Sequence, residues 1–212
     1  MLNIRPEDIE RRSMAIIDAE LAEAGIALEA ANRHVIKRAI HASADLDYAR
    51  TLRFTPDAVR LGVAALTAGA TIVTDTQMAL SGISKPVLDG LGCEAHCFIA
   101  DREVARLAKV RGETRSAVSM DMAAEVPGPL LLAIGNAPTA LIRLRALIDA
   151  GRIRPALIVG VPVGFVNVVE SKELIAASGV PSILAMGRKG GSNIAAAIVN
   201  ALLYEAAGRE QW

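Results

Sequence analysis

The sequence has no net charge, few cysteines and no long apolar run, and each of these features excludes a class of protein. Lysine and arginine together number 23, as do aspartate and glutamate, so no overall field favours nucleic acid or a membrane surface. Two cysteines are too few for a disulfide framework, which favours a reducing cytoplasm. No apolar run approaches the roughly 18 residues of a spanning helix. We therefore expect a soluble cytoplasmic protein.

The residues that are abundant predict one α/β domain spanning residues 1–212. Hydrophobic residues make up 52% of the chain and aromatic residues only 3%, so Ala, Val, Ile and Leu must form the core. This length is sufficient for one full core, whereas a second domain would be cramped. Apolar side chains at helical spacing predict two N-terminal helices, at residues 6–25 and at about 28–42.

From residue 52 onward, short apolar runs alternate with helical patterns. The runs LLLAI and LIVGV are apolar on both faces, as in parallel strands that helices cover on each side. The pattern therefore predicts an open, mostly parallel sheet with helices on both faces. The expected strands are residues 52–54, 71–75, 95–100, 130–135, 156–161 and 182–186. The expected helices are residues 55–69, 76–80, 101–110, 136–151, 166–179 and 190–208.

Three loops after the expected strands are candidate ligand sites, because open α/β sheets bind ligands beyond the carboxyl ends of their strands. The loop MGRKGGSN offers glycines, two basic residues and a helix start, which together suit an anion. It is neither a P-loop nor a dinucleotide fingerprint, because its lysine precedes the glycine pair and it is the last such loop. Each loop can equally be an ordinary structural turn. The candidate residues are Asn136, Thr139, Gly164, Arg188, Gly190, Gly191 and Ser192.

One of the three histidines, His41, stands out by its position. It ends the second expected helix, three residues after Arg38, so the two side chains lie about 60° apart around a helix of roughly 3.6 residues per turn. A histidine favoured there by the helix dipole is the alternative interpretation. His34 falls on the polar side of the same helix, and we expect it to be solvated.

Two further groups of residues suggest binding sites by their local pattern. Ser13 and Arg115 each belong to a pair of a basic residue and a hydroxyl, Arg12-Ser13 and Arg115-Ser116, which are candidates for binding an anion or ordinary helix-surface residues. Cys93, His96 and Cys97 include the residue types that ligate zinc. Strand alternation places His96 and Cys97 on opposite faces, so we expect no metal site there.

Taken together, six motifs resemble the precorrin-8X methylmutase family, which includes the cobalt-precorrin-8 enzymes. The motifs are ERRSMAII, AIHASADLDY, GETRSA, AIGNAPTAL, VGVPVGFVNVVESK and GRKGGSNIAAAIVNAL, and they extend over nearly the whole chain. The resemblance implies an α/β fold and an isomerase of cobalamin biosynthesis. It implies that a methyl group moves from C11 to C12 of the tetrapyrrole substrate, that no separate cofactor is used, and that the protein is a homodimer.

The resemblance also assigns roles to residues. It implies that His41 is the proton donor and acceptor, that Ser13 and Arg38 contact the substrate, and that Arg115 is a further active-site arginine. A histidine suits this role, because imidazole titrates near pH 6.5 and can protonate a ring nitrogen and later recover the proton. The chain departs from the family pattern at Asn167-Val168-Val169, where Gly-Ala-Ala is expected.

Two functions of other classes are alternatives to the isomerase. A non-catalytic corrinoid carrier would share the pocket and bind without changing the ring. A nucleotide-binding oxidoreductase is suggested by the sheet and the glycine loops, but the chain has no dinucleotide fingerprint after its first strand.

Overall fold

The computed structural model describes residues 5–209. Within them, six strands form one sheet in the order β1-β6-β5-β4-β2-β3. The strands are β1 (Leu52–Phe54), β2 (Thr71–Thr74), β3 (Glu94–His96), β4 (Leu130–Ile134), β5 (Leu157–Gly160) and β6 (Ser182–Ala185). All neighbouring strands are parallel except β1, which pairs antiparallel with β6 at one edge. The open, mostly parallel sheet expected from the sequence is confirmed.

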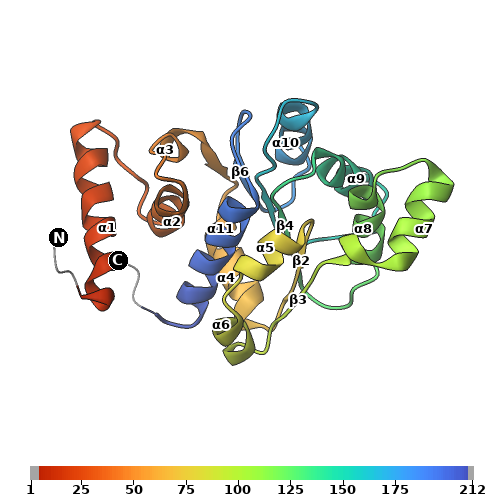
Figure 1. Cartoon of the computed structure of the whole chain (residues 1–212), viewed down its shortest axis with the longest axis horizontal. Coiled ribbons are helices and arrows are strands. Elements are labelled where there is room, and N and C mark those ends of the chain that lie inside the picture. Colours follow the sequence, from red (N-terminus) through yellow and green to blue (C-terminus); the bar gives the residue numbers. More distant parts are fainter. Residues whose placement is uncertain (1–4, 210–212) are drawn as a thin grey trace.

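The helices form two layers, one on each face of the sheet (Figure 1). One face is covered by α2 (Arg33–Ser43), α4 (Ala58–Thr67), α5 (Gln77–Gly82), α6 (Lys85–Gly90) and α11 (Ser192–Ala206). The other is covered by α8 (Arg115–Ala123), α9 (Pro138–Asp149) and α10 (Val168–Ala176). Outside these layers, α1 (Pro6–Glu23) packs on α2 and α7 (Arg102–Arg111) packs on α8. The short helix α3 (Tyr48–Thr51) leads into β1.

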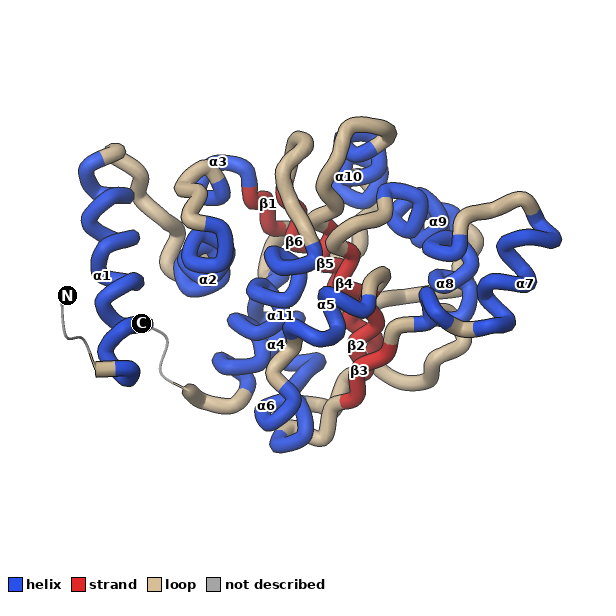
Figure 2. The backbone as a smooth tube through the Cα atoms, in the orientation of Figure 1, coloured by secondary structure: helices blue, strands red, loops and turns tan. Residues whose placement is uncertain are grey.

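The strands are buried on both faces because their side chains alternate between two apolar layers. Leu131 and Ala133 of β4 pack with the α11 side of the sheet, whereas Leu132 and Ile134 pack with α9. Figure 2 shows the strands as the central layer between the two groups of helices. No described helix has the length and apolarity that crossing a membrane requires.

Several local expectations are corrected by the structure. The strand expected at residues 95–100 ends at His96, and Phe98–Ala100 forms a 3₁₀ turn instead, which a hydrogen bond from the amide of Asp101 to the carbonyl of Phe98 closes. Asp101 then caps α7 by accepting a hydrogen bond from the amide of Glu103. The second helix begins at Arg33, five residues later than expected. The short helices α3, α6 and α8 are not among the elements expected from the sequence.

Candidate active site

A hollow of about 410 Å³ between α1 and α2 contains His41 and Ser13. Its other lining residues are mostly aliphatic, namely Ile16, Ile17, Glu20, Ile40, Ala44 and Leu46. The Ser13 hydroxyl donates to the carbonyl of Ile9 at 2.9 Å, which fixes the position of its oxygen and leaves lone pairs to accept another bond. The hollow thus combines a titratable group, a hydroxyl and apolar walls, the composition typical of a small-molecule site.

The three histidines have different surroundings, and only His41 is both exposed and without an acidic partner among residues 5–209. Nε2 of His96 lies 3.0 Å from Glu94, and Nε2 of His34 lies 2.7 Å from Glu205 of α11. The expectation that His34 is solvated is wrong: its side chain is only 14% exposed, and burial lowers its pKa. The His96 side chain is also 43% exposed, so His41 differs from it in having no acidic partner within residues 5–209 and in lining the hollow.

The side chain of Arg38 contacts residues of α1 and α11. It forms an ion pair with Glu10 of α1, and its guanidinium carbon lies 5.0 Å from the ring centroid of Tyr204 in α11. Its side chain is 15% exposed and does not line the hollow that contains His41. The spacing along α2 makes Arg38 and His41 neighbours on the helix, but tertiary contacts direct the arginine toward α1 and α11.

The loop after β6 reaches the turn that follows His41. Nζ of Lys189 lies 2.7 Å from Asp45 and 3.2 Å from Asp47, and Nδ2 of Asn193 donates to the carbonyl of Ala42 at 3.4 Å. The turn itself begins at Ala44, which closes α2 in a left-handed conformation (φ 54°). These contacts bring the histidine-bearing end of α2 to the carboxyl edge of the sheet.

Gly190 in this loop and Gly135 after β4 are required by close packing between loops. A Cβ at Gly190 (φ 157°) would lie 2.0 Å from the carbonyl oxygen of Val161, and a Cβ at Gly135 would lie 2.7 Å from Cα of Ser192. Gly191 (φ 140°) also adopts a backbone conformation that L side chains rarely take, and its amide donates to Val161. The loops after β4, β5 and β6 are therefore in direct contact.

The start of α9 is organised by a residue that sequence reasoning missed. The buried carboxylate of Asp75, which follows β2, accepts hydrogen bonds from the amides of Gly135, Asn136 and Ala137 at 2.7–2.9 Å. Burial raises the pKa of Asp75, and the three amides act in the opposite direction. The backbone donors at this helix start are thus occupied, although the side chain of Asn136 is exposed.

Hydroxyl contacts connect the remaining candidate residues to this edge. Thr114, the N-cap of α8, donates to the hydroxyl of Thr139 in α9 at 2.9 Å, which places the exposed Arg115 beside the start of α9. Ser192 is buried, and its hydroxyl lies 2.8 Å from that of Thr76. Ser192 thus connects α11 to the segment after β2.

The loop after β5 presents apolar side chains beside a cation. Phe165 and Val166 are 82% and 77% exposed, and the guanidinium carbon of Arg188 lies 5.5 Å from the centroid of the Phe165 ring. The amide of Gly164 donates to the carbonyl of Arg188 at 3.2 Å, so the two loops are joined through their backbones. Asn167, which precedes α10, takes φ 57°, which asparagine tolerates better than most residues.

Lys172 is the second organising residue that sequence reasoning missed. It is fully buried in α10, and its Nζ donates to the carbonyls of Gly187 at 2.7 Å and Lys189 at 2.9 Å. A signal was present, because Lys172 lies four residues after Val168 and three before Ile175, within the apolar stripe of the helix. Asp75 gave a similar signal as a carboxylate directly after a buried strand.

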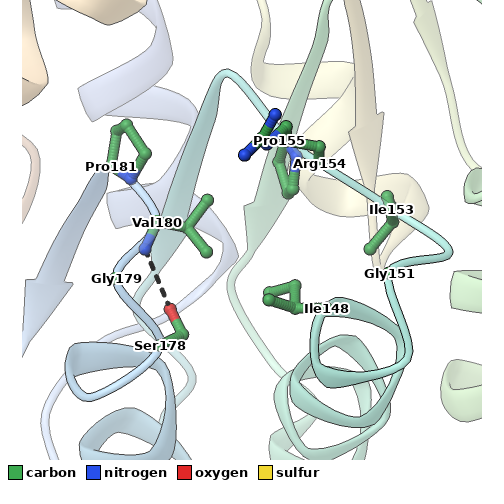
Figure 3. A pocket seen from close by; sticks show the side chains of 9 residues that line it. All are labelled: Ile148, Gly151, Ile153, Arg154, Pro155, Ser178, Gly179, Val180 and Pro181. Carbon is green, nitrogen blue, oxygen red and sulfur yellow. Dashed lines mark hydrogen bonds between the residues drawn. The ribbon is translucent and has the colours of Figure 1, made fainter.

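A second hollow, of about 440 Å³, lies at the amino ends of β5 and β6, opposite the carboxyl edge of the sheet (Figure 3). It is formed by the connections that enter β5 and β6, and its lining includes Ile148, Ile153, Arg154, Ser178 and Val180. Among residues 5–209, no histidine or carboxylate lines it, and the Ser178 hydroxyl accepts from the amide of Val180. The described residues of this hollow thus include no imidazole or carboxylate for proton transfer, whereas the hollow between α1 and α2 contains the imidazole of His41.

No cluster of three or more metal-ligating side chains occurs in the described part of the chain. The thiol of Cys93 donates to the carbonyl of Leu66 at 3.1 Å, and the His96 ring faces Glu94. Cys93 and His96 therefore have separate partners.

Three known proteins, which are similar in sequence or structure, are all named as methylmutases of precorrin-8X or cobalt-precorrin-8. A cobalt-precorrin-8 methylmutase of Leptospira interrogans is 45% identical over 204 residues, covering 92% of each chain. A precorrin-8X methylmutase of Pseudomonas aeruginosa is 44% identical, covering 93% of this chain and 94% of that protein. The crystal structure of a precorrin-8X methylmutase from Thermus thermophilus matches with a TM-score of 0.86 at 37% identity, covering 95% of this chain and 98% of that one.

The family model described as precorrin-8X methylmutase matches residues 8–205. This range includes the hollow between α1 and α2 and the three loops at the carboxyl edge of the sheet. The chain belongs to the precorrin-8X methylmutase family.

Proposed function

We propose that this protein moves a methyl group from C11 to C12 of precorrin-8X or cobalt-precorrin-8, with His41 as the proton donor and acceptor. It is an isomerase of cobalamin biosynthesis, as the names of its relatives indicate. The observation that carries the assignment of the site is the hollow shared by His41 and Ser13, where an exposed histidine lies among mostly aliphatic residues together with Glu20.

The reaction requires the protein to bind the substrate and to transfer a proton. The bond from C11 to the methyl carbon breaks and the bond to C12 forms, with no net transfer of electrons. His41 protonates a ring nitrogen and later recovers the proton, for which an imidazole is well suited near neutral pH. Ile16, Ile40 and Leu46 present apolar surface to the ring and displace water.

The carboxylate arms of the substrate require cationic and polar partners. Arg115 and Arg188 are exposed, and both lie on elements of the carboxyl edge. Arg38 would exchange Glu10 for a substrate carboxylate, since a guanidinium group can form a charged pair with either carboxylate. Thr139 and the side chain of Asn136 supply further polar groups, and Gly164, Gly190, Gly191 and Ser192 shape the loops.

Replacement of the histidine tests the assignment directly. His41→Ala should keep substrate binding and lower kcat by about 10²- to 10⁴-fold, the usual contribution of a positioned acid or base. His96→Ala is the matched control, because His96 is on the distant strand β3 and faces Glu94. Turnover is followed by the spectral change of the rearranged ring. A His41→Ala enzyme with wild-type kcat would refute the assigned role.

We also propose a homodimer in the cytoplasm. Ile9 and Ile16 are 53% and 51% exposed on α1, and helical spacing places them on the same face as Ser13, beside the hollow. A second copy of the chain that covered this face would remove apolar surface from water and enclose the hollow. Light scattering should give twice the protomer mass for the wild type and a monomer for Ile9→Glu. A monomeric wild type would contradict the dimer.

Neither alternative function is favoured. A corrinoid carrier would bind the substrate without the spectral change, so a single-turnover experiment separates it from the isomerase. A nucleotide phosphate at the start of α9 would require free amides there, and those of Gly135, Asn136 and Ala137 are already bonded to Asp75.

A further inference from the structure

Lys172 has an unusual environment that the proposed reaction does not use. The side chain is 0% exposed, and no carboxylate forms an ion pair with it within residues 5–209. Fully buried lysines are rare, because removing an ammonium group from water is costly unless hydrogen bonds compensate. Its hydrogen bonds go instead to two backbone carbonyls, those of Gly187 and Lys189, in one loop.

This loop is held on several sides by the protein. The carbonyl of Arg188, between the two that Lys172 binds, accepts from the amide of Gly164. The amide of Gly191 donates to Val161. Three consecutive carbonyls therefore have fixed partners, and the direction in which the side chain of Lys189 leaves the loop is determined.

From there the contacts continue to the histidine. The side chain of Lys189 leaves the loop to pair with Asp45 and Asp47, in the turn directly after α2. His41 lies in the last turn of α2, only four residues before Asp45. An unbroken series of contacts thus runs from the buried ammonium of Lys172, through the loop and Lys189, to the end of the helix that carries His41.

We propose that Lys172 is a positioning residue for His41. By binding the carbonyls of Gly187 and Lys189, it fixes the loop that presents the side chain of Lys189 to Asp45, and so fixes the end of α2. An apolar residue of similar size would fill the space but leave both carbonyls without a donor. The inference rests on the proposed role of His41.

The kinetic test compares Lys172→Met, Lys189→Met and the double variant. Each single variant should lower kcat by about 10- to 100-fold with a smaller change in KM, because a displaced catalytic group costs rate more than binding. The double variant should lose no more than the worse single variant, because both act through one connection. Losses that multiply, or an unchanged kcat in Lys172→Met, would overturn the proposal.

Ile175→Ala is the matched control for lost stability. Ile175 is buried on the same helix as Lys172 but makes no hydrogen bond to the loop. Assayed where it is fully folded, Ile175→Ala should keep kcat within about twofold. A fall in kcat equal to that of Lys172→Met would mean that stability alone explains the effect. If Lys172→Met does not fold, Lys189→Met carries the test, since its side chain is half exposed.

A spectroscopic measurement separates this inference from the proposed function. The chain has three histidines, so their ring carbon-bound protons can be followed by NMR and that of His41 assigned from His41→Ala. Lys172→Met and Lys189→Met should shift the His41 signal and leave that of His96 in place. An unshifted His41 signal would overturn the positioning role, whether or not His41 proves to be catalytic. An active His41→Ala enzyme would instead refute the proposed function.

Discussion

Two loops at the carboxyl edge of the sheet are organised by single buried charges of opposite sign. After β4, the carboxylate of Asp75 gathers the amides of residues 135–137. After β6, the ammonium of Lys172 gathers the carbonyls of Gly187 and Lys189. In each case the charge comes from another element of the fold, and the loop supplies only backbone groups.

The comparison shows how buried side chains can hold a glycine-containing loop through its backbone groups. Backbone amides and carbonyls that point away from regular structure need partners, and here buried side chains provide them. The same bonds reduce what the backbone can offer to an anionic substrate. We therefore expect the carboxylates of the substrate to depend on side chains such as Arg115 and Arg188 more than on helix starts.

Removing the Asp75 carboxylate, which holds the loop after β4, should have the largest effect on stability. Asp75→Ala leaves three amides without an acceptor, and each buried, unsatisfied donor costs about 1–3 kcal/mol. Allowing for relaxation and water entry, we expect the free energy of unfolding to fall by roughly 3–5 kcal/mol. Urea denaturation measures it, with Asp89→Ala as an exposed control. A loss below about 1 kcal/mol would mean that the loop does not depend on Asp75.

The second comparison is between two glycines of the loop after β6. Gly190→Ala places a Cβ against the Val161 carbonyl, whereas Gly187→Ala (φ 78°) meets no atom within 4 Å. Both substitutions strain the backbone, so the difference between them isolates crowding. We expect Gly190→Ala to be less stable than Gly187→Ala by about 2–3 kcal/mol in urea denaturation. Equal losses would show that the loops are free to separate.

The smallest expected effect is a pH dependence due to Lys172. Burial lowers the pKa of Lys172 to about 8, below the ordinary value of 10.5. Between these values the unfolded chain binds the proton that the folded chain has lost, so stability rises with pH across this window. Relative to Lys172→Met, the wild type should gain about 2 kcal/mol of unfolding free energy between pH 7 and pH 10. A difference that is constant with pH would contradict this assignment.

Local pattern predicted most of the fold and part of the site. The alternation of apolar runs and capped helices gave the sheet, because burial on both faces leaves a direct mark on the sequence of β4 and β5. The strand expected through Ala100 ended at His96, because Phe98–Ala100 forms a local 3₁₀ turn that an apolar run does not reveal. His34 was misjudged because its neighbour Glu205 comes from a helix 171 residues away in the sequence.

What the sequence by itself determined is the order of the six strands, the family and the placement of His41 in the last turn of a helix. These depend on short-range spacing and on motifs that can be read along the chain. Only the tertiary structure decided that Ser13 shares a hollow with His41, that Arg38 faces Glu10 and Tyr204, and that Asp75 and Lys172 hold the loops. The contacts of Asp75 with residues 135–137 and of Lys189 with Asp45 span 60 to 144 residues, and such pairings leave no local periodicity.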